Sequence, residues 1–169
     1  FIKNKKLYRF FSGFNTRKYK NKLRRICETL DIKNPIVVSA YNPEYGLATI
    51  GELEEYLNVY YCYDGMDNER NHWMTIQAEK QYCKKVNGII SSSDFLRIQK
   101  EKLNKESYVV NNGVDFDLFF RHRKTKPRLN HKKVGYIGCL DYRFDIDLIE
   151  DVALSLPNII FEFTGSLLN

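Results

Sequence analysis

The sequence has no long apolar run. None of its uninterrupted apolar stretches approaches the roughly 20 residues that a membrane-spanning helix needs, and no segment has the apolar core of a secretory signal peptide. We therefore expect a soluble, cytoplasmic protein. With 169 residues, 43% of them apolar, the chain is long enough for a domain with a real core. Because it begins at Phe1 and not at a methionine, we expect it to be a piece of a larger protein.

Cysteine and histidine are scarce and scattered. The four cysteines lie far apart, without a CxxC pair, at Cys27, Cys62, Cys83 and Cys139. This pattern favours buried thiols in a reducing compartment over a disulfide framework or a zinc site. The three histidines have no metal-motif spacing to a second ligand. We expect neither a metal nor a cofactor.

Acidic residues are absent from two segments in which basic residues gather. Residues 1–25 hold ten Lys/Arg and residues 121–133 hold seven, and neither segment contains Asp or Glu. The net charge of +6 therefore conceals an acidic remainder of the chain. Basic patches attract nucleic acid, an anionic membrane surface or a phosphorylated ligand. A solvated helix face and a solvated linker explain the two patches equally well.

Strand-like apolar segments alternate with amphipathic helical segments along the chain. The sequence predicts strands at "NPIVVSAY", "NVYYCYD", "GIISSS", "SYVVNN", "VGYIG" and "NIIFEFTG". It predicts helices at residues 17–31, 47–57, 71–86, 94–103 and 145–156. Continuous apolar strands separated by helices are typical of βαβ units in a parallel sheet that is covered on both faces. The predicted class is therefore α/β, with Rossmann-like parallel sheets.

The stretch "YVVNNGVDFDLF" at residues 108–119 links two such sets of strands and helices. Its apolar start is typical of a buried strand, and Asn112-Gly113 is typical of a turn because both residues tolerate positive φ. Asp115 is placed to cap a short helical turn at residues 116–120 by accepting a backbone N–H. A purely structural role explains these features on their own.

Together with "VGYIGCLDYRFDIDLI" after the basic interruption, this stretch resembles the GT-B glycosyltransferases, most closely the retaining group-1 type of family four. The resemblance covers about residues 35–165. It implies two doubly wound domains: a partial acceptor-side domain at 1–111, a linker at 112–132, and the start of a nucleotide-sugar domain at 133–169. Asn112, Gly113 and Asp115 would then form the hinge between the domains.

The resemblance also implies site residues. Gly138 and Arg143 in "GYIGCLDYRFD" would bind the donor diphosphate, although many relatives have arginine at the position of Cys139 and lysine near that of Arg143. Asp64 stands where the family often has a histidine near the transferred sugar, so it would act in catalysis, with Asp67 binding sugar hydroxyls. Tight packing at Gly138, a surface Arg143, and turn or cap roles for the two acids remain alternatives.

The function implied is transfer of a sugar from a nucleotide diphosphate sugar to a carbohydrate or lipid-linked acceptor, with retention, as in polysaccharide biosynthesis. The family's Glu-x7-Glu segment is absent, so we expect this chain alone to be inactive. An NAD-dependent oxidoreductase is disfavoured because G-x-G-x-x-G is missing. The alternative is a basic α/β module without catalysis that binds nucleic acid or an anionic membrane. For the transferase we expect no nucleic-acid partner, whereas binding of residues 1–25 to an anionic membrane surface would suit a lipid-linked acceptor.

Overall fold

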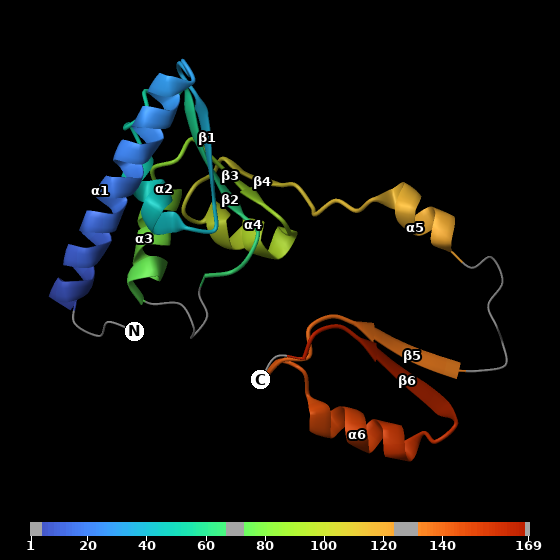
Figure 1. Cartoon of the computed structure of the whole chain (residues 1–169). Coiled ribbons are helices and arrows are strands. Elements are labelled where there is room, and N and C mark those ends of the chain that lie inside the picture. The colour runs from blue at the N-terminus through green and yellow to red at the C-terminus, as the bar shows by residue number, and fades with distance from the viewer. Residues whose placement is uncertain (1–4, 67–72, 124–131, 168–169) are drawn as a thin grey trace. The chain divides into compact units, whose positions relative to one another are not determined.

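The computed structural model describes residues 5–66, 73–123 and 132–167. The chain divides into two compact units, Phe1–Val114 and Asp115–Asn169, and each is described by itself. Both units contain helices and parallel strands (Figure 1), which confirms the predicted α/β class. Within the described residues no helix is both long and apolar enough to cross a bilayer.

The first unit is a four-stranded parallel sheet with strand order β1-β2-β3-β4. A long helix precedes the sheet, and one helix connects each strand to the next. The elements are α1 (Lys5–Thr29), β1 (Ile36–Ala40), α2 (Pro43–Thr49), β2 (Leu57–Cys62), α3 (Trp73–Cys83), β3 (Gly88–Ser91), α4 (Asp94–Glu101) and β4 (Ser107–Val109). The four strands lie where the sequence predicts them, because each is a short run of β-branched or aromatic residues.

The core of this unit lies on one face of the sheet. Tyr60 of β2 and Ile89 of β3 are partners in register and fully buried, and they pack against Tyr82 and Cys83 of α3 and Leu96 of α4. Leu47 of α2 packs against the same cluster. All three connecting helices therefore cover one face, as expected when right-handed crossovers join strands in sequential order.

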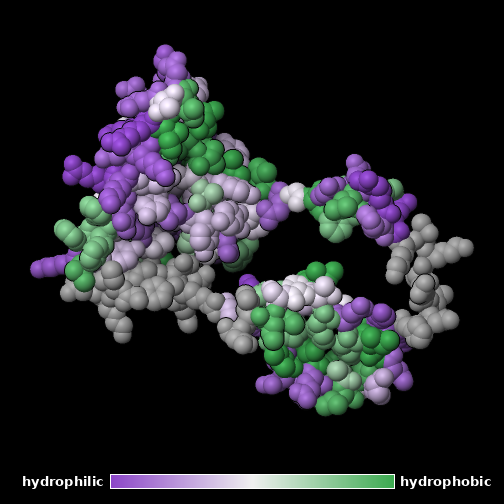
Figure 2. Space-filling model, in the orientation of Figure 1, coloured by the Kyte–Doolittle hydropathy of each residue, from purple (hydrophilic) through white to green (hydrophobic). Residues whose placement is uncertain are grey.

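The opposite face of the sheet is uncovered by the described residues. Ile36 and Val38 of β1 are 61% and 56% exposed, and Tyr108 of β4 is 55% exposed. Figure 2 shows green, apolar atoms gathered over this sheet. The expectation of a sheet covered on both faces is therefore not met within the part of the chain that the structure describes.

A charged pair lies inside the core, between α3 and α4. Lys100 Nζ lies 2.8 Å from Glu79 Oε1, and both side chains are less than 5% exposed. The hydroxyl of Tyr60 donates a second hydrogen bond to the Glu79 carboxylate, at 2.9 Å. Burial of two charges is tolerated because each compensates the other and the carboxylate has a further donor.

Polar contacts fix α1 against α2 and the loop after it. The hydroxyls of Tyr8 and Ser12 donate to Glu44, and both Lys20 and Arg24 form ion pairs with Glu52. The helix begins at Lys5, well before the predicted start at residue 17, because the same spacing of inward-facing residues continues through its first turns.

Helix α2 is displaced from its prediction. The predicted helix at residues 47–57 includes Gly51 and Glu54, and both have positive φ, +71° and +51°, which interrupts a helix. The helix instead begins at Pro43, where the Asn42 side chain accepts the N–H of Tyr45 at 3.2 Å. This shift places Glu44 at the carboxyl end of β1.

The second unit contains α5 (Phe116–His122), β5 (Lys132–Ile137), α6 (Ile146–Ser155) and β6 (Ile159–Thr164). Strands β5 and β6 pair in parallel, with Tyr136 opposite Phe163. Phe144 packs on both of these rings, with centroids 5.0 Å and 5.5 Å away. The predicted cap is confirmed: Asp115 Oδ1 accepts the Leu118 N–H at 2.9 Å.

Candidate functional site

The loops at the carboxyl ends of β1, β2 and β3 carry the candidate site. In a parallel sheet these ends meet at one edge, and ligands of such sheets bind there because the loops present side chains and backbone N–H groups. Two pockets open at this edge in the first unit. One is lined by residues after β1 together with α1 and α3, and the other by residues after β2 and β3.

A pair of stacked tyrosines has one ring at each pocket. Tyr41 follows β1 and lines the first pocket, and Tyr63 follows β2 and lines the second. Their ring centroids are 5.4 Å apart with an interplanar angle of 19°, and both side chains are exposed. An exposed pair of stacked rings offers a flat apolar platform next to polar groups.

The backbone is strained at Tyr41, one of the two residues of this platform. Tyr41 has φ of +60°, and Asn42 N–H donates to the Ala40 carbonyl at 2.7 Å, which closes a tight turn around Tyr41. Such a turn is rare and strained for a residue other than glycine. Strain of this kind persists where the surroundings enforce it and concentrates at functional sites, so it marks this loop as a candidate.

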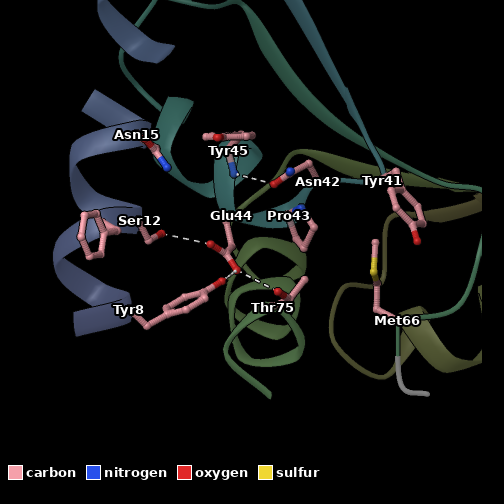
Figure 3. Close-up of a pocket in the computed structure, with 11 residues that line it drawn as sticks. Tyr8, Ser12, Asn15, Tyr41, Asn42, Pro43, Glu44, Tyr45, Met66 and Thr75 are labelled. Atoms are coloured by element: carbon pink, nitrogen blue, oxygen red, sulfur yellow. Dashed lines mark hydrogen bonds between the residues drawn. The ribbon is translucent and has the colours of Figure 1, made fainter. Parts of the chain in front are cut away.

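The first pocket has a volume of about 370 Å³ and is built around Glu44 (Figure 3). Three hydroxyls donate to its carboxylate: those of Tyr8 at 2.5 Å, Ser12 at 3.0 Å and Thr75 at 2.8 Å. Burial of the phenol and its hydrogen bond to Glu44 raise the pKa of Tyr8 to about 12. Tyr8 is therefore a hydrogen-bond donor at neutral pH, and the pocket presents fixed hydroxyl, amide and carboxylate groups.

The sequence offered no local signal for this cluster. Tyr8, Ser12, Glu44 and Thr75 come from three different helices, so no short motif contains them. For Glu44 alone there was a hint, the "NPE" at residues 42–44: an N-cap, a proline and an acid predict that a helix starts at the end of a strand.

The predicted catalytic residue Asp64 lies in the second pocket, which has a volume of about 590 Å³. Its side chain is exposed and accepts the N–H of Gly65 at 2.8 Å, so it shapes the loop after β2 and keeps acceptor capacity. Gln99 also lines this pocket, and its Oε1 is buried with no hydrogen-bond partner among the described residues. The predicted sugar-binding residue Asp67 lies outside the described residues.

The predicted donor-binding residues of the second unit are tied up in local packing. A Cβ added at Gly138 would lie 2.7 Å from the Tyr136 hydroxyl, so the glycine lets the Tyr136 side chain pack closely against the backbone there. Arg143 makes a two-pronged contact with Asp141, with Nε–Oδ1 at 3.0 Å and Nη2–Oδ2 at 2.7 Å. This contact raises the pKa of Arg143. A diphosphate would have to compete with Asp141, and the proposed binding role stays a prediction.

The predicted hinge residues have a different local structure from the expected turn. Asn112 and Gly113 lie in a loop without positive φ, so the conformational freedom that suggested a turn there is not used. Asn112 Oδ1 lies 3.5 Å from the Tyr61 hydroxyl, a contact at the limit of hydrogen bonding. The boundary between the two units falls after Val114, next to the capping residue Asp115.

No protein-family model matches the chain, and no curated protein matches its sequence. The function therefore has to be inferred from the arrangement of the residues themselves.

Proposed function

We propose that the chain is part of a GT-B-type glycosyltransferase that transfers a sugar from a nucleotide diphosphate sugar to a carbohydrate or lipid-linked acceptor. The observation that carries this proposal is the stacked Tyr41–Tyr63 platform between two polar pockets at the carboxyl edge of the sheet. A sugar ring has an apolar C–H face that packs on aromatic rings and a rim of hydroxyls that need polar partners. The platform and its pockets supply both.

The roles divide between the two units. In the first unit, the Glu44 pocket and the platform would hold sugar rings, and Asp64 would accept hydrogen bonds from hydroxyls of the transferring sugar. In the second unit, the loop after β5, with Gly138 and Arg143, would meet the donor diphosphate. We propose that the configuration at the anomeric carbon of the transferred sugar is retained, because the family that the chain resembles is of the retaining type. No step of this scheme requires a metal.

Replacing Asp64 by asparagine is expected to lower turnover about 10- to 150-fold while donor affinity stays the same. The substitution keeps the shape of the side chain but removes a charged acceptor, and a hydrogen bond to a charged group contributes about 1.5–3 kcal/mol. Single-turnover kinetics of sugar transfer by the complete protein measures the first effect, and calorimetry with a nucleoside diphosphate measures the second.

Asp151→Asn is the matched control, because Asp151 is an exposed aspartate on α6. It is expected to leave turnover unchanged. Equal turnover in Asp64→Asn and Asp151→Asn would remove Asp64 from the catalytic site. Release of no nucleoside diphosphate from any nucleotide sugar offered to the complete protein would remove the glycosyltransferase assignment itself.

Replacing Arg143 by alanine is expected to weaken binding of a nucleoside diphosphate about 10- to 150-fold, the effect of losing a charged hydrogen bond. Asp141→Asn should have the opposite effect, because it removes the anion that competes for the guanidinium. Isothermal titration calorimetry measures both affinities, with Arg97→Ala as a control for loss of a surface arginine. Affinities that are unchanged in both loop variants would leave Arg143 with a structural role only.

A further inference from the structure

Helix α1 turns one side toward α2, and within the described part of the chain its other side is exposed. Six residues spaced three or four apart form the uncovered side, here called the outward face: Leu7, Phe10, Phe14, Lys18, Lys22 and Arg25. This spacing places them along one stripe of the helix. The inward-facing residues, such as Tyr8, Ser12 and Lys20, are those bonded to α2 and the loop after it.

The first half of the outward face is apolar. Phe10 is 71% exposed, Phe14 is 54% exposed and Leu7 is 50% exposed. Figure 2 shows light green atoms over the N-terminal half of α1 and purple atoms over its C-terminal half. Exposed phenylalanines on successive turns of one helix face are costly in water, so they indicate a surface that is covered in use.

The second half of the outward face is cationic. Lys18, Lys22 and Arg25 are exposed and make no ion pair within the described part of the chain. The two other cations of this half that face inward, Lys20 and Arg24, are both paired with Glu52. The first acid of the helix is Glu28, one turn beyond Arg25, and no ion pair joins it to these cations among the described residues.

The two halves meet at Phe14, where the Lys18 ammonium lies 4.5 Å from the centre of the ring. Apolar side chains beside cations on one helix face match the boundary of an anionic bilayer, where rings enter the acyl region and ammonium groups meet headgroup phosphates. A single-stranded nucleic acid would use the cations and stack bases on the two phenylalanines, but it has no apolar region to receive the aliphatic side chain of Leu7 beside them.

We propose that the outward face of α1 docks the protein on an anionic lipid surface. The helix would lie in the plane of the interface, with Phe10 and Phe14 inserted and Lys18, Lys22 and Arg25 at the headgroups. This inference does not depend on the proposed function, because it rests on residues outside the candidate site.

Cosedimentation with vesicles tests the proposal. The protein is expected to bind vesicles of phosphatidylglycerol and phosphatidylcholine and to bind phosphatidylcholine alone far more weakly. Phe10→Ser/Phe14→Ser should lower the partition coefficient at least about tenfold, through loss of apolar burial. Lys18→Gln/Lys22→Gln/Arg25→Gln should lower it about fivefold per cation at low salt. Circular dichroism verifies that the variants are folded.

Two control variants match the chemistry of the test variants. Phe119→Ser removes a phenylalanine of α5 that is 66% exposed, and Lys84→Gln/Lys85→Gln removes exposed cations after α3. Neither should change vesicle binding. Failure to bind anionic vesicles would overturn the proposal, as would equal losses in the controls. Binding of a single-stranded oligonucleotide in place of vesicles, with affinity that falls steeply with salt, would assign the face to nucleic acid instead.

Discussion

Replacing Lys100 by methionine is expected to lower the free energy of unfolding of the first unit by about 3–5 kcal/mol. The substitution keeps much of the volume of the side chain but leaves the Glu79 carboxylate buried without its cation. One hydroxyl, that of Tyr60, would still donate to that carboxylate, which does not compensate a full charge in the core. Urea denaturation followed by far-ultraviolet circular dichroism measures the change.

The control for Lys100→Met lies on the same helix, α4. Arg97 forms an ion pair with Glu101 at 2.8 Å, and both side chains are partly exposed to solvent. Loss of this pair in Arg97→Met should cost about 0.3–0.5 kcal/mol, as for other exposed pairs one turn apart in a helix. If Lys100→Met costs no more than Arg97→Met, the buried pair does not stabilise the core.

Removal of both charges shows whether the stability lost in Lys100→Met comes from the unpaired Glu79 carboxylate or from loss of the ion pair itself. Glu79→Leu/Lys100→Met should recover part of the stability, because an apolar pair of similar volume replaces a buried ion pair at little cost, while the buried Tyr60 hydroxyl loses its acceptor at a cost of about 1–3 kcal/mol. The pH dependence has a defined sign. Burial lowers the pKa of Lys100, but the hydrogen bond and charge of Glu79 raise it above its ordinary value. The contribution of the Lys100 charge is therefore present at neutral pH and is lost as the pH rises through that raised pKa.

Replacing Gly46 by alanine is expected to destabilise the first unit by about 1–3 kcal/mol, the cost of overpacking a core. The added Cβ would lie 2.6 Å from two ring atoms of Tyr82. That ring has no room to move, because it is fully buried, contacts Tyr60 edge to face, and donates its hydroxyl to Asn58 at 2.7 Å. Thermal unfolding of the variant measures the loss.

The same substitution should have the opposite sign at Gly13. This residue lies on α1, is exposed, and has no atom within 4 Å of the position of an added Cβ. Gly13→Ala should therefore stabilise the helix by about 0.5–1 kcal/mol, through the lower conformational entropy of alanine in the unfolded chain. Stabilisation by both substitutions would show that Tyr82 yields to the new methyl group.

The sequence predicted the elements better than their arrangement. The strands were predictable because runs such as "IVVSA" and "NVYYC" are short and rich in β-branched or aromatic residues, which favour strands. The helix predicted at 47–57 has displaced bounds: it ends at Thr49, because Gly51 and Glu54 adopt positive φ although the composition of the segment favours a helix. The sheet face that the described residues leave uncovered was not predictable, since apolar periodicity does not specify the order of the strands, and that order decides on which side each right-handed crossover lies.

The candidate site was predictable only where it follows a strand directly. Asp64 follows β2, so its place at the carboxyl edge could be read from the chain. The Glu44 cluster could not, because tertiary packing of α1 and α3 brings its hydroxyls to that carboxylate. The pairing of Arg143 with Asp141 was not predicted, because the resemblance assigns Arg143 to the donor diphosphate and gives no role to the carboxylate two positions earlier.

The strand order of the first sheet has a consequence for biosynthesis. Strands β2, β3 and β4 each pair with the strand that immediately precedes them in the chain. Among the described strands of this sheet, none has to wait for a later one to be inserted beside it, and each connection to be closed joins neighbours in the chain. As the chain leaves the ribosome, the sheet can therefore grow by one strand and one helix at a time, in the order of synthesis.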